Sequence, residues 1–165
     1  IYNSNYLKNK LKEHYKIYIT DENNNVGHEF IIDLNEFKKY GITDKDIAKR
    51  LIDYSFHPPT MSWPVPNSLM IEPTESEDIN ELNRFINAMI NIRKEIDEIK
   101  TGVYSEDNNI LVNSPHSIQD TLNWNFPYSI EKALYPVENL KIKKHFPTNS
   151  RINDIYGDRN LILKD

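Results

Sequence analysis

Cysteine is absent from this chain of 165 residues. Disulfide bonds and thiolate metal sites therefore cannot stabilise the fold, and nucleophilic catalysis by a cysteine–histidine pair is excluded. A chain without cysteine suits a reducing compartment. Hydrophobic residues make up 38% of the sequence, which is enough for the core of one compact domain, and we predict one domain over residues 1–165.

Glycine is scarce: Gly27, Gly41, Gly102 and Gly157 are the four in the chain, and they lie far apart. The phosphate groups of nucleotides and cofactors are commonly held by backbone amides of a glycine-rich loop. The sequence offers no such loop. The G-x-S-x-G pattern of serine hydrolases is missing as well.

Net positive charge and long apolar runs are also lacking. The formal net charge is -5, so we expect no nucleic-acid partner, and we interpret the basic run at residues 141–145 as solvated surface. No apolar run approaches the ~20 residues of a membrane helix, and there is no signal-peptide leader, so we expect a soluble chain with no membrane partner. The chain begins at Ile1 without methionine, which suggests a portion of a longer protein.

The first part of the chain predicts a helix followed by a β-hairpin. Apolar residues recur at helical spacing over residues 5–12, and Ser4 can cap that helix. Residues 16–20 and 26–33 alternate like strands. The turn-forming residues 21–25 lie between them and predict the hairpin connection.

Two further helices are indicated by their termini. Thr43, followed by two aspartates, predicts a helix start, and that helix runs to about Asp53. Thr74 or Ser76 can cap a longer helix that Gly102 ends. The apolar stripe of the longer helix, interrupted by one arginine, comprises Ile79, Leu82, Ile86, Met89, Arg93, Ile96 and Ile99. We expect this helix to pack on a sheet.

Short strands and helices that do not alternate regularly with them predict an α+β domain, with helices on one face of a small sheet. We assign the α+β core to residues 1–103. Residues 104–165 contain several prolines that interrupt regular structure, so we expect at most two short helices there. A tail this long and irregular requires another surface to lie on.

Few residues indicate chemistry by their pattern. The five histidines are scattered without the i, i+4 spacing of a helical metal site, so no metal site is expected. Glu72, Glu75 and Glu77 form an acidic cluster, which we interpret as charge compensation at a helix N-terminus in preference to acid–base catalysis.

Packing does not explain the segment from Phe56 to Glu77, which contains five prolines together with His57, Thr60 and Trp63. A stiff segment loses little entropy on binding and is suited to lining a cleft. A rigid connection between a strand and a helix explains the prolines equally well. The residues alone leave both interpretations open.

Residues 56–65 read FHPPTMSWPV and residues 69–77 read LMIEPTESE. These runs resemble the glycine dehydrogenase (decarboxylating) family, the P-protein of the glycine cleavage system. Further runs resemble the same family in the same order, so the resemblance covers nearly the whole chain: AKRLIDY at 48–54, NSPH at 113–116, PYS at 127–129 and IYGDRNL at 155–161.

The resemblance implies the small C-terminal domain of a fold-type I, aspartate aminotransferase-like enzyme that depends on pyridoxal phosphate. In that family glycine is decarboxylated and the aminomethyl group passes to the lipoyl arm of H-protein. The Schiff-base lysine would lie outside these residues, so no catalytic residue is expected here, and the chain alone is expected to be inactive and to bind no cofactor. The implied partners are H-protein, the remainder of the P-protein and its dimer mate, in a bacterial cytoplasm or a mitochondrial matrix.

The resemblance suggests His57, Thr60, Ser62 and Trp63 as cleft walls near the cofactor or the lipoyl entrance. Arg159 is suggested as a carboxylate or interdomain anchor, although an ion pair with its neighbour Asp158 is the simpler interpretation. For His116, which follows a proline, a role as a local turn residue is as good an interpretation as a functional role.

The sequence departs from the family pattern at Ser55 and Asn67, where the family has glycine, and at Pro58, where it has alanine. Asparagine accepts a left-handed backbone, so the turn at Asn67 is expected to survive, whereas Pro58 is expected to stiffen the loop and shift His57. Leu163 stands where the family has cysteine. A different class of function, a non-catalytic module that binds a peptide or a lipoyl-bearing partner, also remains open.

Overall fold

The computed structural model describes residues 1–161. The N-terminal part contains the helix α1 (Tyr2–Leu11), the strands β1 (Lys16–Ile17) and β2 (Phe30–Asp33), the 3-10 helix η1 (Asn35–Tyr40), the helix α2 (Asp44–Asp53), the strands β3 (Thr60–Met61) and β4 (Ser68–Ile71), and the helix α3 (Ile79–Lys100). The C-terminal part contains η2 (Ile118–Asn123), α4 (Ile130–Leu134), α5 (Leu140–Lys143) and α6 (Asp154–Arg159).

The four strands form one antiparallel sheet in the order β1-β2-β4-β3. Phe30 pairs with Ile71 and Ile32 with Leu69, so these four side chains share one face and are all buried. Met70 on the opposite face is only half-buried. One buried face covered by helices confirms the predicted α+β class.

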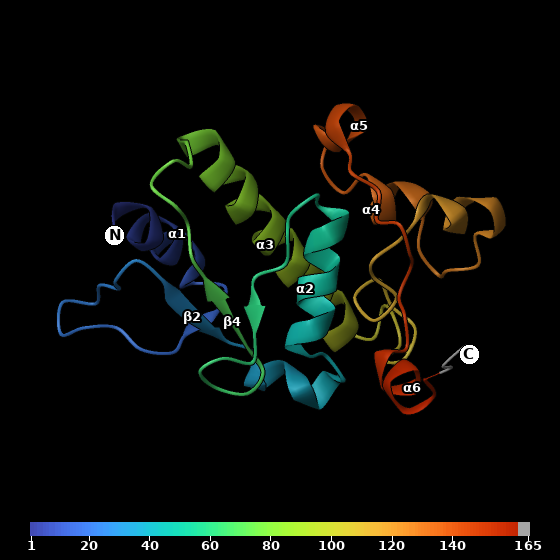
Figure 1. Cartoon of the computed structure of the whole chain (residues 1–165), viewed down its shortest axis with the longest axis horizontal. Helices are drawn as coiled ribbons and strands as arrows, with labels where there is room; N and C mark the ends of the chain where they lie inside the picture. The colour runs from blue at the N-terminus through green and yellow to red at the C-terminus, as the bar shows by residue number, and fades with distance from the viewer. Residues whose placement is uncertain (162–165) are drawn as a thin grey trace.

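Helices α1, α2 and α3 pack together and share the core with the buried sheet face. Figure 1 shows the N-terminus and the C-terminal segment at opposite ends of the long axis, with α4, α5 and α6 on the side of α2 away from the strands. The predicted stripe on α3 is buried except at Ile79, which is 52% exposed, and at Arg93, which is half-buried. Arg93 fits within the stripe because its guanidinium lies 4.7 Å from the Phe37 ring centroid.

The starts of α2 and α3 differ in how well they follow the prediction. Thr43 begins α2 as predicted, and its backbone N–H and hydroxyl both donate to Asp46, at 2.8 and 2.6 Å. The cap of α3 is Asp78, which accepts from the backbone of Glu81 at 2.8 Å, so the predicted caps Thr74 and Ser76 are wrong.

The N-terminal prediction needs two corrections. Ser4 lies inside α1 and does not cap it, because its hydroxyl donates to the Gly27 carbonyl and ties the helix to the following loop. The two strands pair antiparallel, which confirms the predicted hairpin, and the predicted turn forms at residues 21–25. The strands are shorter than predicted, so that turn lies within a wider loop of residues 18–29. Asp21 stabilises this loop by accepting from two backbone amides, at 2.9 and 2.7 Å.

The chain beyond residue 103 has more helix than predicted. It contains three short α-helices and one 3-10 helix within the described residues, whereas at most two short helices were expected. Local capping explains part of the difference: Ser129 accepts from Lys132 at the start of α4, and Asn153 accepts from Tyr156 at the start of α6. Ile110 belongs to the same hydrophobic core as the N-terminal elements, as do Leu111, Ala133, Leu134 and Leu140.

Candidate functional site

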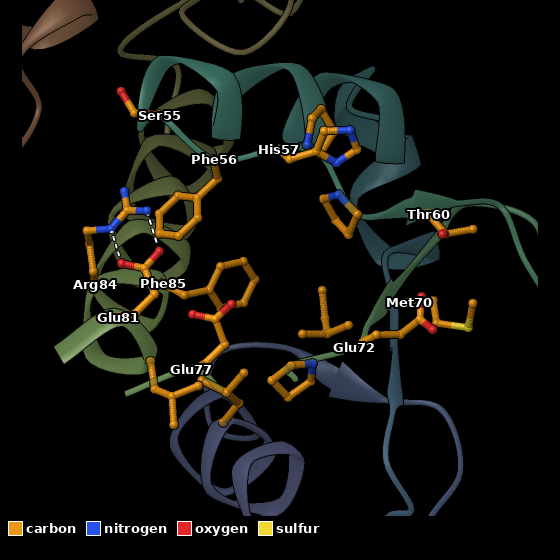
Figure 2. Close-up of a pocket in the computed structure, with 16 residues that line it drawn as sticks. Ser55, Phe56, His57, Thr60, Met70, Glu72, Glu77, Glu81, Arg84 and Phe85 are labelled. Carbon is orange, nitrogen blue, oxygen red and sulfur yellow. Dashed lines mark hydrogen bonds and ion pairs between the residues drawn. The ribbon is translucent and has the colours of Figure 1, made fainter. Parts of the chain in front are cut away.

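A groove of about 600 Å³ opens between the segment that follows α2, the end of β4 and the first half of α3 (Figure 2). Aromatic rings and prolines form its walls, and glutamates lie among them. The lining residues are Leu7, Ser55, Phe56, His57, Pro58, Pro59, Thr60, Met70, Ile71, Glu72, Pro73, Glu77, Glu81, Leu82, Arg84 and Phe85. The groove is concave, like most ligand or partner sites, but charged and polar side chains contribute more to its lining than is usual for a small-molecule site.

One wall of the groove is built from stacked side chains. The Phe56 and Phe85 rings meet edge to face, with centroids 5.4 Å apart. The Arg84 guanidinium carbon lies 3.6 Å from the Phe56 centroid, and its Nη1 donates to the Tyr54 carbonyl at 3.0 Å. These contacts fix the arginine on the ring and join α3 to the end of α2.

The groove carries an excess of negative charge. Arg84 is paired with Glu81 through two hydrogen bonds, at 2.7 and 2.5 Å, which Figure 2 shows as dashed lines. Glu72 and Glu77 have no ion-pair partner within residues 1–161. The groove therefore favours a cationic or amine-bearing group over an anion.

The groove segment after α2 begins with a constrained residue. Ser55 has a left-handed backbone, with φ of 62°, and the next amide, of Phe56, donates to the Leu51 carbonyl at 3.0 Å. Glycine adopts this conformation without strain, which explains the glycine of the resembled family at this position. The turn directs Phe56 into the groove and leaves His57 exposed at its edge.

The structure brings together some of the site residues suggested by the sequence and separates others. His57 and Thr60 line the groove. Ser62 and Trp63 follow β3 and lie outside it, and Trp63 is 63% exposed. Arg159 lies at the end of α6, is exposed, and forms no ion pair with Asp158 within the described chain.

A buried charged network, which sequence reasoning missed, lies between α2, α3 and the C-terminal segment. Arg50 is completely buried and pairs with Glu95 through Nε at 3.0 Å and Nη2 at 2.7 Å. Its Nη1 donates to Asp53 at 3.0 Å and to the Ala133 carbonyl at 2.7 Å, and Nη2 also donates to the Lys132 carbonyl at 2.9 Å. Every donor of this guanidinium group is thus satisfied.

Asp53 extends the network to His116. The carboxylate accepts from the His116 backbone and from Nδ1 of its ring, both at 2.8 Å. A carboxylate only accepts, so Nδ1 carries the hydrogen, and Nε2 lies 2.9 Å from the Tyr128 hydroxyl. His116 is fully buried, so its interpretation as a local turn residue is wrong.

The network shifts the pKa values of its members. Burial alone would raise the pKa of Asp53, but the hydrogen bonds from His116 and the charge of Arg50 hold it below its usual range. Burial opposes the charge of Arg50, yet Glu95 raises the pKa of the guanidinium above its ordinary value. Desolvation raises the pKa of Tyr128. Asp53 and Arg50 are therefore both charged at neutral pH.

The sequence did contain a signal for this network. Arg50 and Asp53 lie within the AKRLIDY run and His116 ends the NSPH run, both of which resemble the glycine dehydrogenase family. Charged residues on the buried side of a helix, such as Arg50 beside Leu51, require partners. Glu95 lies 45 positions from its partner Arg50, and His116 lies 63 positions from its partner Asp53. Spacing alone could therefore not identify these partners.

Comparison with known proteins decides the family. The family described as glycine dehydrogenase, C-terminal domain, matches residues 1–116, which include α1 to α3, the groove and the buried network as far as His116. This chain belongs to that family. The predicted resemblance is thereby confirmed.

Relatives of the family match nearly the whole chain. It is 52% identical over 162 residues to the putative mitochondrial glycine dehydrogenase (decarboxylating) of Schizosaccharomyces pombe, covering 96% of this chain and 16% of the relative. It is 53% identical over 165 residues to the mitochondrial glycine dehydrogenase (decarboxylating) of Dictyostelium discoideum, covering 98% and 17%. Glycine dehydrogenase (decarboxylating) 1 of Colwellia psychrerythraea is 51% identical over 164 residues, covering 98% and 17%.

The chain therefore spans about one sixth of the length of these family members. Among residues 1–161, no helix has the length and apolar character needed to cross a membrane. Leu163, which stands where the resembled family has cysteine, lies outside the described residues.

Proposed function

We propose that this chain is the C-terminal domain of a glycine dehydrogenase (decarboxylating), a pyridoxal-phosphate enzyme of fold type I. The complete enzyme removes carbon dioxide from glycine and transfers the aminomethyl group to the lipoyl arm of H-protein. The observation that carries the proposal is the match of the family over residues 1–116, with relatives about half identical in a yeast, an amoeba and a bacterium.

The groove by itself lacks two parts that a pyridoxal-phosphate site needs. The groove contains no lysine, and none of the four glycines lies in it, so it has neither a Schiff-base residue nor a phosphate cradle. Its excess of carboxylates also disfavours a phosphate. The Schiff-base lysine and the phosphate cradle of the complete enzyme are therefore expected in sequence outside this chain, and the isolated chain is expected to be inactive and to bind no cofactor.

The contribution of this domain is to shape the active-site cleft from one side. His57 and Thr60 are the residues we propose as cleft walls, because both line the groove. The excess carboxylates fit an amine-bearing group better than an anion. As cleft residues, Ser62, Trp63 and Arg159 stay predictions, since they lie outside the groove.

The partners and compartment follow from the same proposal. Lipoyl H-protein, the remainder of the P-protein and its dimer mate are the expected partners. Eukaryotic relatives are named mitochondrial and the bacterial relative is not, so a mitochondrial matrix or a bacterial cytoplasm is expected according to the source.

The proposal is tested by purifying the complete protein that carries this chain and measuring exchange of labelled carbon dioxide into glycine. Exchange that requires both pyridoxal phosphate and lipoyl H-protein supports it. A complete protein that binds H-protein but catalyses no exchange would favour the non-catalytic module instead.

The substitution His57→Ala in the complete enzyme provides a sharper test of the groove. Because His57 is exposed at the groove edge, its loss should lower glycine exchange about 10-fold to 100-fold while the melting temperature changes little. His28→Ala is the matched control, since His28 is an exposed histidine outside the groove. Equal losses of activity and stability in His57→Ala would assign the residue to packing.

A further inference from the structure

Residues 62–67 form a turn, here called the Trp63 turn, that is held by hydrogen bonds within it and to its neighbours. Ser62 and Asn67 both have left-handed backbones, with φ of 53° and 56°. The Ser62 hydroxyl donates to Asp44 at 2.5 Å and accepts from the Asn67 amide at 3.1 Å. The Asn67 side chain in turn accepts from the Asp44 amide at 2.8 Å, which fixes the turn to the start of α2.

A second set of contacts fixes the turn to the end of β2. The Leu34 amide donates to the Asn67 carbonyl at 3.0 Å, and the Asn35 side chain donates to the Pro66 carbonyl at 3.3 Å. Within the turn and its exit, the Ser68 hydroxyl donates to the Val65 carbonyl at 2.6 Å. These contacts preorganise the turn for a partner.

The outer surface of this rigid turn is apolar. Trp63 is 63% exposed, and Pro64 and Pro66 beside it are exposed as well. Met61, on the preceding strand, is 39% exposed. Single exposed apolar residues are ordinary, but a tryptophan held on a preformed turn loses little conformational freedom on binding, which is the property of an interface anchor.

We propose that the Trp63 turn docks into an apolar pocket on the part of the enzyme that lies outside these 165 residues. The inference rests on the proposed function and names a contact surface within it. Relatives are about six times as long as this chain, so a large folded portion is available to cover the turn. None of the turn residues 62–67 lines the groove, so the docked turn is a surface separate from the groove lining.

The test is oxidative footprinting of the complete enzyme, read by mass spectrometry at Trp63 in the native protein and in urea. Docking predicts that native Trp63 is oxidised at least about tenfold more slowly than in urea, because the ring is removed from solvent. Leu122, which is 75% exposed in this chain, is the matched control and should show little protection. Native Trp63 that reacts at nearly its rate in urea overturns the proposal.

Two further measurements exclude other occupants. Trp63 in the isolated chain should be reactive at all concentrations, and protection that grows with concentration would show that a second copy covers the turn, which overturns the proposal. In the complete enzyme Trp63→Ala should lower the melting temperature, Trp63→Phe should restore most of it, and Leu122→Ala should leave it unchanged. No loss in Trp63→Ala also contradicts docking.

The same preparations separate this inference from the proposed function. Protected Trp63 in an enzyme without glycine exchange refutes the function and keeps the docking surface. Reactive Trp63 in an enzyme with full exchange refutes the docking surface and keeps the function.

Discussion

Arg50 shows how single residues determine this structure. Its guanidinium is completely buried between two carboxylates, Glu95 and Asp53, and donates to two backbone carbonyls of the C-terminal segment. Removing one member of such a pair leaves a charge without a partner in a medium that solvates it poorly. The network therefore fixes how α2, α3 and the C-terminal segment meet.

Asp53→Asn tests this network directly. The substitution should lower the free energy of unfolding at pH 7 by about 3–5 kcal/mol, because Arg50 and His116 lose a charged acceptor. Urea denaturation of the isolated chain is the measurement. Asp107→Asn, at an exposed position, is the control and should change stability by less than about 0.5 kcal/mol.

The same aspartate predicts a pH dependence. Its pKa in the folded chain is below the value of about 3.9 expected in the unfolded chain, so its stabilising contribution is complete above about pH 4. That contribution is lost as the pH falls through the lowered pKa. As the pH falls below 4, the unfolding free energy of Asp53→Asn should therefore fall less than that of the parent chain. An equally steep fall in both chains would contradict a lowered pKa of Asp53.

At the scale of elements, the turn between β3 and β4 depends on Asn67. Its φ of 56° favours glycine or asparagine, and its side-chain oxygen accepts from the Asp44 amide. The nitrogen of the same side chain is buried without a partner among the described residues. Asparagine therefore tolerates the left-handed backbone and accepts a hydrogen bond at the start of α2. Its buried side-chain nitrogen, however, is an unsatisfied donor.

Asn67→Gly and Asn67→Ala separate these effects. Alanine loses the hydrogen bond to Asp44 and strains the left-handed backbone, so it should cost about 2–4 kcal/mol of unfolding free energy. Glycine relieves the strain and removes the unsatisfied nitrogen, so its cost should be about 1 kcal/mol or less. Alanine as stable as glycine, measured by urea denaturation, would show that the backbone angle is unimportant.

The elements that sequence predicted well are those with local signals. Thr43 and Gly102 mark the start of α2 and the end of α3 correctly, because capping and left-handed preference act within a few residues. The start of α3 was missed because Asp78 competes with two nearby hydroxyl residues. The wide loop after β1 was missed because α1, through Ser4, holds it by tertiary contacts.

The candidate site was predicted only in part for a related reason. His57 and Thr60 are close in sequence and both line the groove. Its other wall, Phe85 and Arg84, comes from a helix about 25 residues later, and no periodicity connects the two. The Arg50–Glu95 and Asp53–His116 contacts join residues that are still farther apart in the sequence, so only the fold could reveal them.

At the scale of the whole molecule, the C-terminal segment is bound to the core by charges as well as by apolar packing. Lys132 pairs with Glu98 at 2.5 Å, and Arg151 pairs with Asp46 at 2.6 Å. Ile110 and Leu134 are buried in the common core. The boundary assigned at residue 103 stays a prediction about independent folding.

Truncation tests that boundary. Residues 1–103 without the remainder should lose cooperative unfolding, because Arg50 loses two carbonyl acceptors and the core loses the apolar side chains of the C-terminal segment. Residues 1–144 should keep a cooperative transition at lower temperature, since they lose mainly the Arg151 and Asp154 ion pairs. Circular dichroism during heating distinguishes the two. A cooperative transition in residues 1–103 would establish that segment as an independent core.

The central claim, that this chain completes a glycine dehydrogenase, is tested most directly by a chimera. The matching C-terminal segment of the Dictyostelium discoideum relative, 53% identical, is replaced by residues 1–165 of this chain, and glycine–carbon dioxide exchange is measured with lipoyl H-protein. The account predicts exchange within about tenfold of the unmodified enzyme, and none when the segment is deleted. A folded chimera that binds pyridoxal phosphate but shows no exchange would contradict it.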